Sequence, residues 1–299
     1  MESHRHNHDH GTTNRGRPLA LALAITSIYF IAEVVGGILT NSLALLSDAG
    51  HMFSDIAALA LSLVAFRVAR RPITTTRTFG YHRFEILAAL LNGLTLWLIV
   101  GAIFHAAYHR ISDPPEVQSV GMLVVATIGL VVNVTAGLIL YGSQRESLNI
   151  RGAFLHVVGD ALGSVGAIAA GLIMLLTEWY LADPIISIFI GVIILYTSWE
   201  LVKDSVNILL QGVPKEIELD KLKLELEQIN GVTNVHDLHV WAVTSGVFTI
   251  SVHAVVEKTV ANDHVLERME RLLADRFHIH HSTIQIEHQN RESRELTAF

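Results

Sequence analysis

The chain has no cysteine among its 299 residues and is poor in charge, with only 16% Asp, Glu, Lys and Arg. The first absence excludes disulfides, zinc sites built on thiolates and thiol catalysis. Soluble domains carry about 25% charged residues, so the second absence indicates that much of the chain lies in a membrane. The net charge of −7, with no basic face to offset it, argues against nucleic-acid binding.

Hydrophobic residues make up 51% of the chain, and its 17 histidines are many for this length. With cysteine absent, any metal must be held by histidines and carboxylates. Met1–Asn14 is polar and His-rich, and it lacks the apolar core and cleavage site of a secretory signal. We therefore expect the first apolar segment to stay in the membrane.

Apolar runs close to the roughly 20 residues needed to cross hydrocarbon recur through the first two-thirds of the chain. We expect membrane spans at about Pro18–Leu39, Ser42–Val68, Ile86–Tyr108, Val120–Gly142, Phe154–Thr177 and Pro184–Val202. Six spans return the chain to the side on which it started.

Arginines mark the orientation of these spans. They gather in the N-terminal tail, the second connection and the fourth connection: Arg5, Arg15, Arg17, Arg67, Arg70, Arg71, Arg77, Arg83, Arg145 and Arg151. The first and fifth connections carry no Lys or Arg, and the third carries only Arg110. The positive-inside rule then places both termini in the cytoplasm, and we expect the protein in the inner or plasma membrane.

After about Gln211 the composition becomes that of a soluble domain. Helical spacing at Ile217–Ile229 and Val260–Phe277 alternates with expected strands at Val232–Val243, Val247–Val256 and Thr283–His288. The order α-β-β-α-β predicts a small ferredoxin-like α+β domain. The expected fold is thus a polytopic α-helical membrane protein with a His-rich cytoplasmic tail (1–17), a six-helix transmembrane domain (18–210) and a cytoplasmic domain (211–299).

Two His-x-x-x-Asp motifs lie in the second and fifth expected spans. His51 and Asp55 form the first, and His156 and Asp160 form the second. A spacing of four residues puts each pair on one helical face. If the two helices face each other, two imidazoles and two carboxylates meet, an arrangement that suits tetrahedral Zn²⁺.

The energetic cost of these groups favours a metal site over structural pairing with neighbouring helices. A carboxylate at the bilayer centre costs roughly 2.5–3.5 kcal/mol on the lenient insertion scale, and this chain places two there. Other polar residues in the spans are less specific. Glu33 and Asn133 could line a cavity or bond between helices, and Asp48 could face the outer mouth.

The stretch Gly36–Asp55 closely resembles the signature of the cation diffusion facilitators, in the branch of cobalt–zinc–cadmium resistance proteins and zinc transporters. Phe79-Gly80-Tyr81 with Arg83 and Glu85, and the run His236–Trp241, are further marks of this family. The resemblance covers essentially the whole chain. It implies a homodimer in which each protomer exchanges a cytoplasmic divalent cation for protons, with His51, Asp55, His156 and Asp160 as the transport site. The resemblance also implies that His51 favours zinc over cadmium, because members with Asp at this position accept cadmium more readily.

The resemblance also implies metal ligands in the cytoplasmic domain. The positions that match are His236, His239, His253, His264 and Glu287. Gln289 stands where some relatives have a carboxylate, so one zinc per cytoplasmic domain is expected rather than two. Histidines in strands without a metal are the alternative for His239 and His253.

The cluster His4, His6, His8, Asp9 and His10 is interpreted as a low-affinity metal-collecting tail, with an expression tag as the alternative. Two other functions compete with transport. A membrane metallo-enzyme is disfavoured because no His-Glu-x-x-His occurs, and we expect no enzymatic activity. A metal sensor would bind metal without flux. Within the transporter interpretation, Co²⁺ or Cd²⁺ as the main ion stays open.

Overall fold

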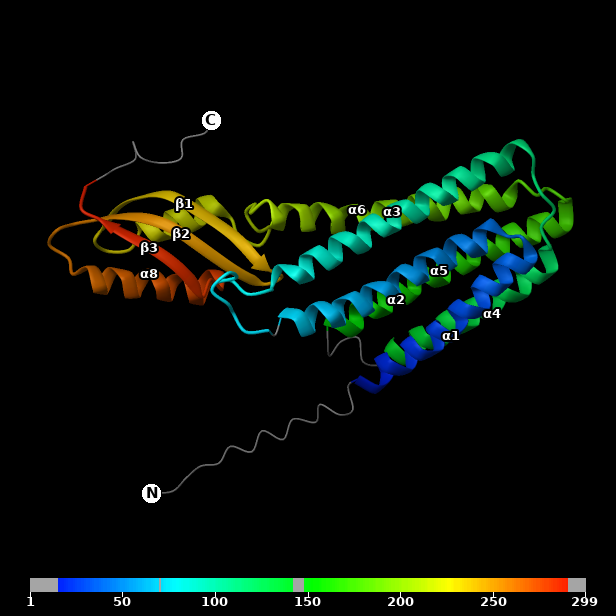
Figure 1. The fold of residues 1–299 in the computed structure, drawn as a ribbon, viewed down its shortest axis with the longest axis horizontal. Coiled ribbons are helices and arrows are strands. Elements are labelled where there is room, and N and C mark those ends of the chain that lie inside the picture. Colours follow the sequence, from blue (N-terminus) through cyan, green and yellow to red (C-terminus); the bar gives the residue numbers. More distant parts are fainter. Residues whose placement is uncertain (1–15, 70, 142–147, 290–299) are drawn as a thin grey trace, which may run out of the picture. The chain divides into compact units, whose positions relative to one another are not determined.

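The structure is a computed structural model that describes residues 16–69, 71–141 and 148–289 (Figure 1). It divides into two compact units. The first joins residues 1–57 to residues 94–198, and the second joins residues 58–93 to residues 199–299.

Long helices form the described part of the first two-thirds of the chain. They are α1 (Gly16–Thr40), α2 (Leu43–Ala69), α3 (Arg83–Ser112), α4 (Ser119–Tyr141), α5 (Leu148–Thr177) and α6 (Ala182–Leu209). Each corresponds to one expected span. In the described residues, α3, α4, α6 and the part of α5 from Val157 to Thr177 are long and apolar enough to cross a membrane. The protein is therefore a polytopic helical membrane protein.

Large apolar side chains cover the outer surfaces of these helices. Leu98, Leu138, Leu176 and Tyr196 are among the most exposed of them. Exposed apolar surface on this scale is costly in water and is typical of helices that face lipid.

Inside the first unit, α4 packs against both α1 and α5. Glycines make the α1–α4 contact close. Gly129 lies against the ring of Tyr29, and Gly36 lies against Val125, so a Cβ at either glycine would collide with its neighbour. Such small residues let helix backbones approach in a membrane.

Asp183, at the start of α6, caps the N-terminus of α2. Its buried carboxylate accepts hydrogen bonds from Ser42 Oγ (2.7 Å), from the backbone N–H of Leu43 (2.7 Å) and from that of Ala44 (3.0 Å). The first N–H groups of a helix have no partner within the helix and carry a partial positive charge. A negative side chain from another helix therefore satisfies them.

Arg110, near the end of α3, completes this arrangement. Its Nη1 lies 3.3 Å from Asp183 Oδ2 and donates to the backbone oxygen of Asn41 at 2.6 Å. Its Nη2 donates to Asn41 Oδ1 at 2.9 Å, while Asn41 adopts a left-handed backbone with φ of 56°. The guanidinium thus ties the end of α3 to the α1–α2 turn and to α6.

The second unit contains the predicted α/β domain. Its elements are α7 (Leu219–Glu227), β1 (Val232–Thr244), β2 (Val247–Val256), α8 (Asn262–Phe277) and β3 (His281–Glu287). The strands form one sheet in the order β1-β2-β3, with β1 antiparallel and β3 parallel to β2. The predicted order α-β-β-α-β is confirmed.

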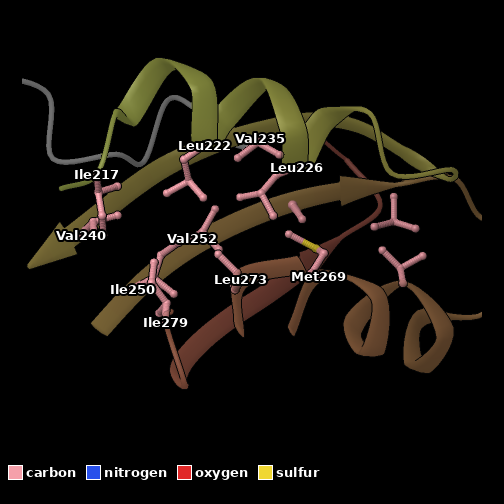
Figure 2. Packing of buried hydrophobic residues seen from close by; sticks show 13 residues of the cluster. Ile217, Leu222, Leu226, Val235, Val240, Ile250, Val252, Met269, Leu273 and Ile279 are labelled. Atoms are coloured by element: carbon pink, nitrogen blue, oxygen red, sulfur yellow. The ribbon is translucent and has the colours of Figure 1, made fainter. Parts of the chain in front are cut away.

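The core of this domain follows from strand alternation. Ile250 and Val252 of β2 are fully buried and pack with Leu222 of α7 and with Met269 and Leu273 of α8 (Figure 2). Residues at the intervening positions, His253 among them, lie on the other face of the sheet because successive strand side chains alternate. That other face carries polar side chains from all three strands.

The ends of two long helices also belong to this unit. At the start of α3, Glu85 accepts a hydrogen bond from Thr244 Oγ1 of β1 at 2.8 Å. After α6, Lys215 Nζ lies 2.6 Å from Asp204 and 3.1 Å from Glu200. Hydrogen bonds to Asp204 and then Glu200 raise the pKa of the Lys215 ammonium above its usual value.

Candidate metal sites

The first site lies between α2 and α5. His51 Nε2 is 3.7 Å from Asp55 Oδ2, one turn along α2, and 3.9 Å from Asp160 Oδ1 of α5. Three of the four residues predicted for the membrane site are therefore together. His156 lies on α5 one turn before Asp160, and its side chain falls outside the described part of the structure.

Small residues allow this approach of α2 to α5. The carboxylate of Asp48 lies within 3.4–3.8 Å of the place where a Cβ would stand at Gly163. Ala49 and Ser164, on either side of the same contact, are buried. A bulky side chain at Gly163 would push Asp48 away and open the helix pair.

The donors of this membrane site suit Zn²⁺. A tetrahedral ion 2.0–2.2 Å from nitrogen and oxygen ligands brings neighbouring donors to about 3.4 Å from one another. The observed separations of 3.7 and 3.9 Å need a contraction of only a few tenths of an ångström. The side chain of Asp160 is 6% exposed, whereas those of His51 and Asp55 are 22% and 33% exposed, so the α2 residues of the site are less enclosed than Asp160.

The second site lies on the sheet face opposite the hydrophobic core. His236 of β1, His253 of β2 and Glu287 of β3 each offer a ligand atom, and these atoms all lie within 4.8 Å of one another. His236 Nε2 is 3.4 Å from Glu287 Oε2, and His253 Nδ1 is 3.7 Å from Glu287 Oε1. The side chains of His236 and Glu287 are each 4% exposed. This enclosure and donor set suit a divalent metal ion.

An irregularity in β1 extends the second site. His236 pairs with His253, but the next pair is His239 with Ser251, so β1 contains one more residue than β2 over this stretch. The bulge falls at Asp237, whose φ is 49°. An extra residue of this kind re-aims the side chains around it. Asp237 consequently reaches the sheet face that carries the histidines.

Asp237 bridges two of the predicted ligands. Its Oδ1 lies 2.8 Å from His239 Nε2, and its Oδ2 lies 3.5 Å from His253 Nε2. A carboxylate bonded to the second nitrogen of a ligating histidine fixes the ring and its tautomer. Asp237 was not predicted as a site residue. The sequence signal was its place inside the run His236–His239, but strand alternation alone would put it on the other face.

Charges around Glu287 favour its ionised form. Burial by itself raises the pKa of this carboxyl, but the hydrogen bond from Gln285 and the attraction of His236 and His253 outweigh it. The net result is a pKa below the usual value for glutamate. An anionic Glu287 is the form that binds a metal.

The remaining predicted ligands are not in this group. His264 lies in the first turn of α8 and is exposed, and it is not among the three residues whose ligand atoms meet. His4, His6, His8 and His10 lie outside the described residues.

The helical membrane domain carries one set of candidate metal ligands between two of its helices, and the α/β domain carries a second set. These features define a membrane protein that acts on metal ions. A family model described as the cation efflux transmembrane domain matches residues 19–210, and one described as the cytoplasmic domain of cation efflux proteins matches residues 214–289. The chain belongs to the cation efflux family, the cation diffusion facilitators. The predicted family is confirmed.

Characterised relatives match over most of their length. The metal cation efflux system protein CzcD of Cupriavidus metallidurans is 46% identical over 266 residues, which are 88% of this chain and 84% of the relative. The cadmium, cobalt and zinc/H⁺-K⁺ antiporter of Bacillus subtilis is 44% identical over 264 residues, 87% of this chain and 85% of that protein. The zinc transporter ZitB of Escherichia coli is 42% identical over 267 residues, 89% and 85% of the two chains.

Among solved structures, the metal-bound C-terminal domain of the CzcD transporter from Cupriavidus metallidurans is 39% identical to the aligned part of this chain. The match covers 24% of this chain and 99% of that domain, with a TM-score of 0.23.

Proposed function

We propose that this protein exports divalent metal ions, chiefly Zn²⁺, from the cytoplasm in exchange for protons. The observation that carries the proposal is the meeting of His51 and Asp55 on α2 with Asp160 on α5. Ionisable groups inside membrane helices mark ion paths. We assign the fourth ligand to His156, which the helical spacing puts on the same side of α5 as Asp160.

Histidine chemistry supplies the coupling to protons. A neutral imidazole binds Zn²⁺, whereas a protonated one repels it, and the unperturbed pKa of about 6.5 lies in the working range. The site releases its metal when it takes up protons on the acidic side of the membrane. It loses those protons and binds metal again when it faces the cytoplasm. Alternating access of the helix pairs makes this exchange directional.

Zinc is favoured as the main cargo because two histidines and two carboxylates form a set that Zn²⁺ accepts in a tetrahedron. Among the relatives, one is named a zinc transporter and another a cadmium, cobalt and zinc antiporter. Co²⁺ and Cd²⁺ are thus the alternative cargoes, since ligand type alone does not select among these ions.

The same proposal includes the arrangement in the cell. We infer six membrane spans within residues 18–210, both termini in the cytoplasm, and a homodimer in the inner or plasma membrane. The arginine distribution supports the orientation. The family description of residues 214–289 as a cytoplasmic domain agrees with the placement of residues 211–299.

In the cytoplasmic domain, we assign a resident divalent metal, Zn²⁺ by preference, to His236, His253 and Glu287. Such an ion would join three strands through their side chains and so stiffen the sheet. Asp237 would hold the ring of His253 through Nε2, the nitrogen that does not face Glu287. His239, which contacts the other oxygen of Asp237, would lie at the outer end of these contacts.

Zinc flux into acid-loaded proteoliposomes tests the transport proposal. Wild-type protein is compared with Asp160→Asn, which keeps the side-chain volume but removes the buried charge, and with Asp113→Asn, a matched change at an exposed carboxylate. We expect uptake that requires the pH gradient in wild type and in Asp113→Asn, and at least a tenfold loss in Asp160→Asn.

Equal flux in Asp160→Asn and wild type would refute the assignment of the membrane site. Flux that ignores the pH gradient would refute proton exchange. Zinc binding with no flux in any variant would instead favour a membrane-embedded metal sensor, for which the buried ligands of the cytoplasmic domain are the supporting observation.

A further inference from the structure

Two more carboxyl groups are buried beside the membrane site, outside the His-x-x-x-Asp motifs. Glu33 of α1 is 1% exposed and Asp48 of α2 is 5% exposed. Asp48 lies one turn before His51, and its carboxylate rests on Gly163, one turn after Asp160 on α5. The pair therefore lies about one helical turn from the transport site, toward the N-terminal end of α2.

Glu33 is only half satisfied by its surroundings. Its Oε1 accepts a hydrogen bond from Tyr29 Oη at 2.9 Å, and the same hydroxyl lies 3.4 Å from the backbone oxygen of Val125. Its Oε2 is buried and receives no hydrogen bond from any N–H or hydroxyl donor in the part of the chain that the structure describes. The group that Glu33 faces is the carboxyl of Asp48.

Two facing carboxylates in this position need a cation or a shared proton to offset their charge. Each costs several kcal/mol to bury without a partner, and like charges in contact oppose one another. Among the described groups that act on Asp48, His51, which the transport site uses, supplies attraction, while Asp160 and Asp55 add negative charge. A divalent ion between Glu33 and Asp48 would remove both costs, and such an ion is the proposed cargo.

We propose that Glu33 and Asp48 form a second divalent-cation site, which the transported ion occupies on its path between the transport site and the N-terminal end of α2. The proposal rests on the proposed function. The site offers carboxylate oxygens, with the Tyr29 hydroxyl behind them, and no nitrogen. Oxygen donors suit harder ions such as Mn²⁺, so the second site discriminates less in favour of Zn²⁺ than the histidine site and releases its ion more readily.

Manganese binding to the full-length protein in nanodiscs tests this site. Free Mn²⁺ is followed by electron paramagnetic resonance in a background chain that carries Asp55→Asn and Glu287→Gln, which disable the other two sites. We expect the background chain to bind one Mn²⁺. We expect at least tenfold weaker binding after Glu33→Gln or Asp48→Asn, and unchanged binding after Asp113→Asn.

Zinc flux is then measured with Glu33→Gln in the otherwise wild-type chain. We expect at least a fivefold loss of flux while zinc still binds at the transport site. If Glu33→Gln keeps the wild-type flux, the second site is refuted and the proposed function stands. If the wild-type protein itself shows no flux, the proposed function is refuted.

Two further outcomes keep the proposal open to refutation. If Glu33→Gln does not yield folded protein, Asp48→Asn carries the test, because the site needs both carboxylates. If Mn²⁺ binding is unchanged and only the pH dependence of flux shifts, the pair holds a proton and the cation site is refuted.

Discussion

Replacing Asp183 by Asn should destabilise the membrane domain more than any other single charge removal at this end of the helices. The carboxylate accepts three hydrogen bonds, from Ser42, Leu43 and Ala44, and pairs with Arg110. Hydrogen bonds to a charged group contribute about 1.5–3 kcal/mol and neutral ones about 0.5–1.5 kcal/mol. Asn keeps only one acceptor oxygen, so the bonds from Ser42 and Ala44 to Oδ1 can persist with a loss of about 1 kcal/mol each, whereas the bond from the Leu43 N–H to Oδ2 is lost at a cost of about 1.5–3 kcal/mol.

The total loss is about 3.5–5 kcal/mol from these bonds, which agrees with the range of about 3–5 kcal/mol for a buried ion pair broken by removal of one partner. A loss of 1 kcal/mol shifts Tm by about 2–4 °C in chains of 150–250 residues. We therefore expect Tm to fall by about 7–20 °C, measured by thermal unfolding in nanodiscs at one fixed scan rate, because a Tm from irreversible unfolding depends on the scan rate.

A double-mutant cycle separates the ion pair from the helix cap. Asp183→Asn is combined with Arg110→Gln. If the carboxylate of Asp183 caps α2, Asp183→Asn should still lower the stability when Arg110 is absent. Asp113→Asn, at an exposed carboxylate beyond the end of α3, is the matched control and should leave Tm unchanged. A shift below about 2 °C in Asp183→Asn would refute this reasoning.

Three other changes have defined outcomes. In a chain that also carries Asp160→Asn, Glu287→Gln should weaken zinc binding at least tenfold as measured by calorimetry, whereas His280→Gln, at an exposed histidine, should leave it unchanged. Equal zinc affinity with and without Glu287→Gln would show that Glu287 is not a ligand. Gly129→Val should lower stability by about 1–3 kcal/mol through overpacking against Tyr29, and Gly101→Ala, which meets open space, is its control. Lys215→Met should lower Tm slightly at pH 7 but should have no effect at a pH above the raised pKa of Lys215. The pKa of this lysine is higher in the folded than in the unfolded protein, so its stabilisation is complete below the unfolded-state pKa and is lost as the pH rises through the folded-state pKa. An effect on Tm that does not depend on pH would contradict the ion-pair explanation.

The length of the apolar runs and the sequence periodicity were sufficient to predict the elements and the spacing of the proposed membrane ligands. The helical period places His51 and Asp55 on one face whatever the helix packs against, and the expected spans correspond to α1 to α6. Strand alternation likewise explains why Val252 lies in the core and His253 on the opposite face, although the two faces were not assigned from the sequence. These are local properties, which a sequence encodes directly.

Contacts between distant segments could not be predicted in this way. Spacing does not show that Asp183 caps α2, since the two are about 140 residues apart, nor that Glu33 faces Asp48. Asp237 was missed for a different reason. The rule of strict alternation fails where a bulge adds a residue, and nothing in the sequence around Asp237 marks a left-handed backbone except the tolerance of Asp for it.

The two proposed ligand sets differ in enclosure, and the difference fits the separate roles that we propose for them. An exported ion must enter and leave at every cycle, so its ligands need access to water and cannot all be buried; His51 and Asp55 are partly exposed while Asp160 is not. A resident ion gains from enclosure, because the carboxylate that binds it is held away from competing water, and His236 and Glu287 are almost wholly buried. If this distinction holds, dilution into a weak chelator should empty the membrane site within seconds while zinc in the cytoplasmic domain stays bound. Zinc that leaves both sites at the same rate would contradict the separation of cargo from resident metal.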